Sequence, residues 1–569
     1  MARFDSSEKS AALWTRRTML GALGLGLPTS LLACKREDSS AADAAIDELC
    51  PLDASEPYSD AAASAPDLEV CPHPDAGSGS FDARPDEDAT TDAGVSPDGS
   101  IGDASTSSDA APPDALPEDT GPPCDESADG GSSASPPGPP RARNVLLIVV
   151  DDLNSWIHTL GGHPQARTPN LDRLAAMGLS FTNAHTSAPE CNAARVAMFT
   201  GFRPSSTGVY DNTIPFRTVR PDAVTLFEAF RAGGYSVAGG GKIFHFTDAG
   251  SFETYFSAGG DPVPPASMRP INGIPGATDF DWGPLDVPDE RMGDARLASW
   301  AEQLLSAPSD RPFVLAAGLQ KPHLPFYVPR AYFDLFPISS IVLPEILAND
   351  LDDVPPSGVA LAAPNGDHAR VVAAGQWAAA VQGYLASIAF ADAMVGRLLD
   401  ALASGPNAED TLIVLTTDHG WHLGEKLHWR KFALWEEATR VPLIVAGPGI
   451  PRGTTTSAPV STLDVYPTLV EWMGLARRPE LEGRCLVPLL EDPTRPFDGV
   501  AVSTWGVGNH SVRTDRFRYI RYASGQEELY DHSTDPHEWR NLAAEPSTLS
   551  TRRALRAHVP QDLPFCRPR

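Results

Sequence analysis

Runs of apolar, β-branched residues recur along the chain after about residue 143, and helical patterns lie between them. The apolar runs occupy residues 144–150, 313–317, 412–416 and 443–446. Unbroken runs of this kind are typical of strands that are buried on both faces of a parallel sheet. Apolar residues at helical spacing occupy residues 171–177, 224–232 and 384–402. The alternation predicts an α/β fold with a large, mostly parallel central sheet flanked by helices.

The pattern changes after about residue 491, where short alternating stretches are separated by turn residues. Residues 516–522 are the clearest of these stretches. Alternation at a period of two is typical of antiparallel strands with one buried face. A chain of 569 residues is also too long for one ordinary domain. We therefore expect a catalytic domain at 143–491 and a smaller subdomain with an antiparallel sheet at 492–569.

A short apolar run follows paired arginines near the N-terminus. The run at residues 20–33 is too short to span a bilayer as a stable helix. Arg16 and Arg17 indicate twin-arginine export, and Leu31-Leu32-Ala33-Cys34 has the form of a bacterial lipoprotein cleavage box. We interpret residues 1–34 as an export signal that leaves Cys34 lipidated, so the protein is expected at the cell envelope, held to the membrane only by lipid. An ordinary secretory signal with a chance cysteine is the alternative.

The segment that follows is dominated by Ala, Asp, Ser, Pro and Gly. Such a composition cannot bury enough surface to offset the entropy lost on ordering, so we interpret residues 35–142 as a disordered acidic linker. Residues 35–143 hold 25 Asp or Glu against 5 Lys or Arg, about two thirds of the formal net charge of −30. The acidity therefore describes the linker, and the chain offers no basic face for nucleic acid.

Seven cysteines are scattered along the chain without the close spacings of a zinc site. Cys485 and Cys566 are the two that lie outside the N-terminal segments and are not part of the candidate chemistry below. Whether they form a disulfide stays open.

Acidic residues follow two of the predicted strands. Asp151-Asp152 follows the first run, and Asp418-His419 follows the run from residue 412. Since the carboxyl ends of parallel strands meet at one edge of a sheet, these groups are expected to lie close together and to repel one another unless a cation lies between them. Mostly oxygen ligands favour calcium or magnesium over zinc. The alternative for an isolated Asp151 is the cap of a turn.

A cysteine stands at the predicted start of a helix, in Cys191-Asn192-Ala193-Ala194-Arg195. The free backbone amides at a helix N-terminus favour an anion. Arg195 returns to the same face one turn later, so both residues are expected to meet a bound sulfate. Taken alone, a buried free cysteine is more often inert packing than a nucleophile.

Further positive charge and proton-transfer groups follow two other strands. The segments are Gly239-Gly240-Gly241-Lys242-Ile243-Phe244-His245 and Lys321-Pro322-His323. The glycines are expected to permit close approach of the backbone to a ligand. Lys431 comes shortly after Asp418 and adds a cation. A single Lys or His of this kind is usually structural, but the set indicates a pocket for a tetrahedral oxyanion.

Together these motifs resemble the type I, formylglycine-dependent sulfatases of the alkaline phosphatase superfamily. The resemblance rests on Asp151-Asp152, Cys191-x-Ala193-x-Arg195 with Thr200-Gly201, Gly241-Lys242-x-x-His245, Lys321-Pro322-His323, Asp418-His419-Gly420 and Glu528-Leu529-Tyr530-Asp531. It covers residues 144–542. His419, Gly-Lys-Ile-Phe-His and Lys-Pro-His-Leu-Pro-Phe look most like the iduronate 2-sulfatase branch. Ala193 and Ala194 depart from the proline and serine of the usual motif.

The resemblance implies a modified cysteine and one metal ion. A maturation enzyme would oxidise Cys191 to formylglycine (3-oxoalanine), whose hydrated aldehyde attacks sulfur. One Ca²⁺ would lie among Asp151, Asp152, Cys191, Asp418 and His419 and lower the pKa of the attacking hydroxyl.

The resemblance also implies roles for the cationic groups. Arg195, Lys242 and Lys431 would hold the nucleophile and the sulfate. His323 would protonate the departing alcohol, and His245 would take the proton that expels sulfate.

The predicted function is therefore hydrolysis of sulfate esters, with sulfated carbohydrates as the expected class and specificity in rim loops 211–217 and 259–288. Two alternatives stay open. One is a phosphodiesterase or phosphonate hydrolase of the same superfamily, and the other is a catalytically dead lipoprotein that binds sulfated glycans.

Overall fold

The computed structural model describes residues 138–276 and 279–563. A sheet of eight strands lies at its centre, in the order β13-β2-β12-β9-β1-β7-β4-β5. The strands are β1 (Asn144–Val150), β2 (Gly178–Phe181), β4 (Ser236–Gly241), β5 (Thr254–Phe256), β7 (Phe313–Leu319), β9 (Thr411–Thr417), β12 (Leu443–Ala446) and β13 (Thr454–Thr456). Among these eight, β12 alone runs antiparallel to its neighbours. The predicted α/β fold with a mostly parallel sheet is confirmed.

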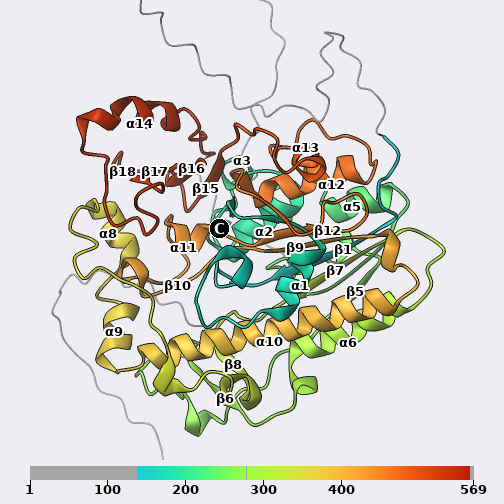
Figure 1. Ribbon diagram of the computed structural model, residues 1–569, viewed down its shortest axis with the longest axis horizontal. Helices are drawn as coiled ribbons and strands as arrows, with labels where there is room; N and C mark the ends of the chain where they lie inside the picture. The colour runs from blue at the N-terminus through green and yellow to red at the C-terminus, as the bar shows by residue number, and fades with distance from the viewer. Residues whose placement is uncertain (1–137, 277–278, 564–569) are drawn as a thin grey trace, which may run out of the picture. The chain divides into compact units, whose positions relative to one another are not determined.

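Helices cover both faces of this sheet (Figure 1). Side chains of β1 alternate between two apolar clusters, with Leu146 and Ile148 in one and Val145 and Leu147 in the other. The first cluster contains α1 (Pro169–Met177), α6 (Gly293–Ser306) and α10 (Trp377–Ser404). The second contains α2 (Cys191–Thr200), α5 (Leu226–Ala232), α12 (Val465–Trp472) and α13 (Val487–Glu491). Burial on both faces explains why residues 145–150 of β1 are all apolar.

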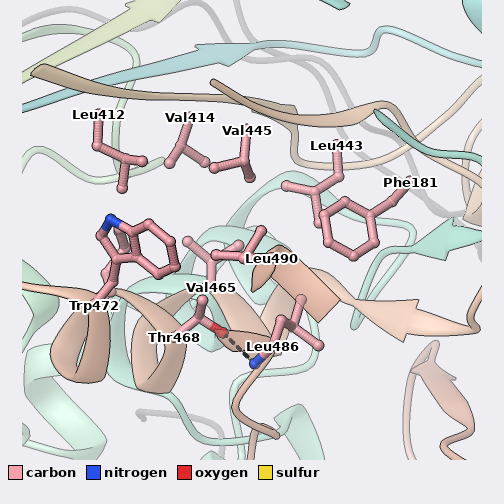
Figure 2. A pocket seen from close by; sticks show the side chains of 11 residues that line it. Phe181, Leu412, Val414, Leu443, Val445, Val465, Thr468, Trp472, Leu486 and Leu490 are labelled. Carbon is pink, nitrogen blue, oxygen red and sulfur yellow. Dashed lines mark hydrogen bonds between the residues drawn. The ribbon is translucent and has the colours of Figure 1, made fainter. Parts of the chain in front are cut away.

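A void of about 20 Å³ remains in the second cluster (Figure 2). It lies between strands β2, β9 and β12 on one side and α12 and α13 on the other. Its lining is apolar apart from Thr468, whose hydroxyl oxygen accepts a hydrogen bond from the backbone of Leu486. The void is a packing defect of the core and not a polar site.

The C-terminal part contains a separate four-stranded antiparallel sheet, as predicted. Its strands are β15 (Ala501–Thr504), β16 (His510–Arg513), β17 (Phe517–Arg521) and β18 (Glu527–Asp531). Buried ion pairs join this sheet to α11 (Glu436–Thr439): Arg518 bonds to both Glu436 and Glu538. None of the helices in the described ranges is both long and apolar enough to span a bilayer. The predicted export signal, lipid anchor and most of the acidic linker lie outside the described residues, as does Cys566. The last residues of the predicted linker, 138–142, are described and do not fit a disordered segment, because Ala142 is buried in the second cluster and the Arg141 amide donates to the Trp472 carbonyl oxygen over 3.0 Å. The predicted boundary at residue 143 is therefore too late by a few residues.

Candidate active site

Four adjacent parallel strands end at one edge of the large sheet, and each is followed by polar residues. The strands lie in the order β9, β1, β7 and β4. The residues that follow them are Asp418 and His419, Asp151 and Asp152, Lys321 and His323, and Lys242, in that order. Their convergence at this edge follows from the parallel arrangement of the strands.

Cys191 is the first residue of α2 and is almost fully buried. Its Sγ lies 3.2 Å from Lys431 Nζ, 3.3 Å from His419 Nε2 and 3.6 Å from Lys242 Nζ. Burial alone would raise the pKa of this thiol, but the positive charges of Lys242, Lys431 and His419 outweigh it and hold the pKa well below its ordinary value. The side chain at position 191 is therefore held in a site that stabilises negative charge.

Arg195 lies one turn further along α2 and is fully buried. Its Nε donates to Asp418 Oδ2 over 2.9 Å, and its Nη2 donates to Asp151 Oδ1 over 2.8 Å. Its Nη1 donates to the backbone carbonyls of Lys242 and Ile243. The guanidinium thereby fixes the orientation of two carboxylates from different strands.

Asp152 adopts a left-handed backbone conformation, with φ of +60°. Its Oδ1 accepts a hydrogen bond from Lys431 Nζ over 2.9 Å. Its Oδ2 is buried and accepts no hydrogen bond, although His323 Nε2 lies 3.9 Å away. A buried carboxylate oxygen without a donor is a good candidate for a metal ligand.

The carboxylates and one imidazole form a group that fits a divalent cation. Ligand atoms of Asp152, Cys191, Asp418 and His419 all lie within 4.8 Å of one another, and all four residues are buried. His419 Nδ1 lies 3.1 Å from the carbonyl oxygen of Gly420, so Nδ1 carries the proton in the neutral ring and Nε2 is left to face the group. Burial raises the pKa of Asp418 to about 7 despite Arg195 beside it. A bound cation would stabilise the charged form of these carboxylates. Carboxylate oxygens favour a hard cation such as Ca²⁺ or Mg²⁺.

Two histidines complete the centre. His245 lies beside Cys191 and helps to lower the pKa of its thiol, and its own Nδ1 has no hydrogen-bond partner. The His323 side chain is 29% exposed, so it lies where a substrate could reach it. The structure thus brings together every candidate site residue: Asp151, Asp152, Cys191, Arg195, Lys242, His245, His323, Asp418, His419 and Lys431.

The three glycines before Lys242 do not serve close approach to a ligand, and that prediction is wrong. They belong to strand β4, and neighbouring side chains and backbone fill the space beside them. A Cβ on Gly239 would lie 2.4 Å from the Phe252 ring. Gly241 has φ of +71°, and a Cβ there would lie 2.1 Å from the Gly318 carbonyl oxygen. These glycines permit close packing within the sheet.

Lys321 does not add charge to the pocket, contrary to the expectation from its motif. Its Nζ donates to the carbonyl oxygens of Pro325, over 2.8 Å, and His323, over 3.3 Å. The same Nζ lies 3.3 Å from Asp261 Oδ2. Lys321 is 1% exposed and is neutralised away from Cys191.

Sequence reasoning missed several residues that support the centre. The Tyr384 hydroxyl donates to the Asp152 carbonyl oxygen over 2.7 Å. Asn212 stabilises the start of α2, because its Oδ1 accepts a hydrogen bond from the backbone amide of Asn192 over 2.9 Å. Glu190 precedes Cys191, and burial raises its pKa to about 7. Asn212 could have been found from the sequence, because it is a polar residue in rim loop 211–217. No feature of the sequence indicated Tyr384.

A second cavity, of about 710 Å³, lies apart from these residues. Residues of the loop after β1, of α11 and of the C-terminal sheet line it, and no residue of the Cys191 centre does. Two of its carboxyl groups have raised pKa values, because burial raises Glu437 to about 8 and Glu425 to about 7.

Comparison with known proteins agrees with this geometry. The family profile described as Sulfatase matches residues 143–475, more than half of the chain. The chain belongs to the sulfatase family. The profile described as N-sulphoglucosamine sulphohydrolase, C-terminal, matches residues 424–562 of this sulfatase. The predicted family and the predicted enzyme class, a sulfuric ester hydrolase, are confirmed.

Three similar proteins illustrate the range of the family. The sulfatase is 40% identical over 443 residues to a protein of Formosa agariphila named "Sulfatase", covering 74% of this chain and 86% of that one. It is 33% identical over 368 residues to human iduronate 2-sulfatase, covering 58% and 63%. The solved structure of the phosphonate monoester hydrolase of Agrobacterium radiobacter aligns with a TM-score of 0.60 at 25% identity, covering 74% and 97%.

Proposed function

We propose that this sulfatase hydrolyses sulfate esters of carbohydrates and that a maturation enzyme supplies its nucleophile by oxidising Cys191 to formylglycine. The observation that carries the proposal is the setting of Cys191 at the start of α2, with two lysines and a histidine within 3.6 Å of its sulfur. An inert packing cysteine has no need of three cationic neighbours. The carbohydrate class is supported by the similarity to human iduronate 2-sulfatase.

Each residue of the centre has a role in this proposal. Formylglycine at position 191 would supply a hydrated aldehyde as nucleophile. Asp151, Asp152, Asp418 and His419 would hold one Ca²⁺, which would neutralise charge on the sulfate. Lys242 and Lys431 bind sulfate oxygens beside residue 191. His323, when protonated on both ring nitrogens, gives its Nε2 proton to the leaving alcohol oxygen, and His245 accepts a proton beside residue 191. Arg195 keeps Asp151 and Asp418 in place.

Phosphonate or phosphodiester hydrolysis is the second candidate, since the Agrobacterium radiobacter enzyme has a similar fold. The full complement of lysines and histidines around Cys191 favours sulfate. A glycan-binding protein without turnover would keep Cys191 as a thiol. These three functions differ in the chemical state of residue 191 and in the ester that is cleaved.

We also propose export by the twin-arginine route and anchoring at the cell envelope through a lipid on Cys34. The motifs in residues 1–34 support this proposal. Fractionation of the producing cells tests it, because Cys34→Ser should move the protein from the membrane to the soluble fraction.

A substrate panel with mass spectrometry tests the function. In a host with a competent maturation system, the tryptic peptide 174–195 should carry an aldehyde and no sulfur at position 191. Purified protein should turn over at least one sulfated sugar among glycosaminoglycan fragments, algal polysaccharides, choline sulfate, aryl sulfates and aryl phosphates. Cys191→Ala should fold normally and lose essentially all turnover.

Three outcomes contradict the proposal. Faster cleavage of aryl phosphates than of every sulfate ester would favour the phosphoryl alternative. Better turnover of choline sulfate than of every sulfated sugar would exclude the carbohydrate class. Equal turnover by unmodified protein with a cysteine at 191 would exclude the formylglycine mechanism.

A further inference from the structure

The loop that carries His323 is held from inside by a buried charge. Lys321 Nζ donates to the carbonyl oxygens of His323 and Pro325, at 3.3 and 2.8 Å. The carbonyl between them, that of Leu324, lies 2.6 Å from His323 Nδ1. Three consecutive carbonyls are thus engaged, two by the lysine and one by the imidazole.

This arrangement fixes the state of the imidazole. A carbonyl oxygen can only accept a hydrogen bond, so Nδ1 of His323 must carry the proton that points to Leu324. The other nitrogen, Nε2, then faces the catalytic centre, 3.9 Å from Asp152 Oδ2. A second proton taken up at Nε2 gives the imidazolium that acts as the general acid. The direction of Nε2 depends on the place of the Leu324 carbonyl, and Lys321 holds the carbonyls on both sides of it.

Lys321 is itself held by acidic residues at both ends. Its backbone amide donates to Asp294 Oδ2 over 2.9 Å, and the amide of Gln320 donates to Asp294 Oδ1 over 2.8 Å. Its ammonium pairs with Asp261 Oδ2 at 3.3 Å, and Asp261 Oδ1 accepts the Gly293 amide over 2.7 Å. Asp261 belongs to segment 259–288, so Lys321 ties that insertion to the His323 loop.

We propose that Lys321 is a positioning residue for His323 and that Asp261 links this positioning to rim loop 259–288, where substrate specificity is expected. The inference rests on the proposed function, in which His323 protonates the leaving alcohol. A buried ammonium is costly unless its three donors find acceptors, and here all three acceptors lie in the two segments to be joined. The lysine acts through the loop and not on the sulfate, since its Nζ bonds to the backbone carbonyls of His323 and Pro325 and to the Asp261 carboxylate, away from Cys191.

Leaving-group dependence tests this role. Lys321→Met should lower kcat for the best sulfated sugar of the panel by at least about 30-fold, because a general acid contributes about 10²–10⁴-fold. With 4-nitrophenyl sulfate, whose leaving group needs no proton, kcat should fall less than about threefold and KM should stay near its original value. Asp261→Asn should also lower kcat more for the sulfated sugar than for 4-nitrophenyl sulfate, but by a smaller factor than Lys321→Met. It also keeps the test available if Lys321→Met does not fold.

Lys426→Met is the matched control. Lys426 is another buried lysine, paired with Asp350 at 2.7 Å, and it lies outside the centre. Its loss should lower stability without any dependence on the leaving group. Equal losses on both esters in Lys321→Met or Asp261→Asn would overturn the inference, as would no loss on either. A rise in KM with unchanged kcat would instead make Lys321 a direct sulfate ligand, which also contradicts it.

A second measurement does not depend on turnover. In protein labelled with ¹⁵N-histidine, the ring nitrogens of His323 report its tautomer, with His323→Gln providing the assignment. At a pH where the ring is neutral, Lys321→Met should convert the single Nδ1-protonated form into a mixture of tautomers. An unchanged tautomer would count against the inference. A wild-type protein that shows the expected tautomer and cleaves no sulfate ester would count against the proposed function alone.

Discussion

The hydroxyl of Tyr384 donates a hydrogen bond of 2.7 Å to the backbone carbonyl of Asp152 and accepts one of 3.0 Å from the amide of Asn154. Tyr384 lies on α10 and is fully buried. Asp152 has a left-handed φ of +60°, a backbone conformation that is uncommon for residues other than glycine. The tyrosine therefore restrains the turn that presents a candidate metal ligand.

Tyr384→Phe should weaken both the fold and calcium binding. The change leaves a buried carbonyl and a buried amide without this partner, which costs about 1–3 kcal/mol of unfolding free energy. Calcium affinity, measured by isothermal titration, should fall by about 3- to 10-fold, because supporting contacts tune metal sites. Tyr327→Phe is the control, since that buried hydroxyl bonds to Asp281, away from the metal group. A similar loss of calcium affinity in both variants would exclude a specific role.

Removal of the metal should abolish activity, and calcium should restore it. The group of Asp152, Asp418 and His419 is rich in hard oxygen donors, which suits Ca²⁺ better than Zn²⁺. Asp418→Asn should lower turnover by more than about 100-fold. It should also remove the rise in melting temperature that calcium gives the wild type. Restoration of the chelated enzyme by zinc with calcium inert would contradict the ligand assignment.

Stability should fall as pH rises from about 4.5 to 8, in part because of Glu437. Burial raises the pKa of this carboxyl from an ordinary value of 4.5 to about 8. Within that window the folded state holds a proton that the unfolded chain has lost, so each rise in pH favours unfolding. Glu437→Gln should flatten the dependence of melting temperature on pH. Glu345→Gln, an exposed residue at the same cavity, should leave it unchanged; equal slopes in all three proteins would refute the assignment.

The void in Figure 2 should accept one methyl group. Val465 lines it, whereas Val470 lies on the same helix, is equally buried and does not. Val465→Ile should raise the unfolding free energy by up to about 0.8 kcal/mol, the value of one buried methylene. Val470→Ile should be neutral or destabilising, because it overfills a packed core. Denaturant titration measures both, and stabilisation by the Val470 variant alone would contradict the placement of the void.

The apolar runs predicted the central strands, since burial on both faces leaves a strong signal in sequence. The direction of β12 was not predictable, because a run such as residues 443–446 has the same composition in either orientation. The role of the three glycines of β4 was predicted wrongly for a related reason. Glycine permits close approach of a ligand or of a neighbouring side chain, and only the structure shows Phe252 beside Gly239.

The candidate centre was predictable because each of its residues belongs to a short motif at a strand or helix end. The residues that support the centre do not belong to such motifs. Tyr384 reaches Asp152 across 232 positions, and its contact follows from packing of α10 on the sheet. The sequence predicted the motif around Lys321 but not where the lysine side chain points. The fold of residues 320–325 turns this side chain away from the His323 ring and toward the loop carbonyls.

The N-terminal limit of the folded part can be tested with two shortened chains. Arg141 and Arg143 precede β1 and bind the body of the protein. The Arg141 amide donates to the Trp472 carbonyl over 3.0 Å, and its guanidinium lies 4.8 Å from the Trp472 ring centroid. The Arg143 amide donates to the Asp410 carbonyl over 2.9 Å.

A chain that starts at Pro139 should be soluble, unfold cooperatively and keep full activity, because the composition of residues 35–138, which it lacks, cannot supply a core. A chain that starts at Asn144 loses both arginines and should have an unfolding free energy lower by about 1–3 kcal/mol, since it loses two backbone hydrogen bonds and a cation–π contact. Its kcat should be unchanged, because neither arginine contacts the Cys191 centre. The comparison separates the two segments: lost cooperativity in the Pro139 chain would show that the acidic segment takes part in folding. Equal unfolding free energies of the two chains would show that residues 139–143 do not stabilise the fold.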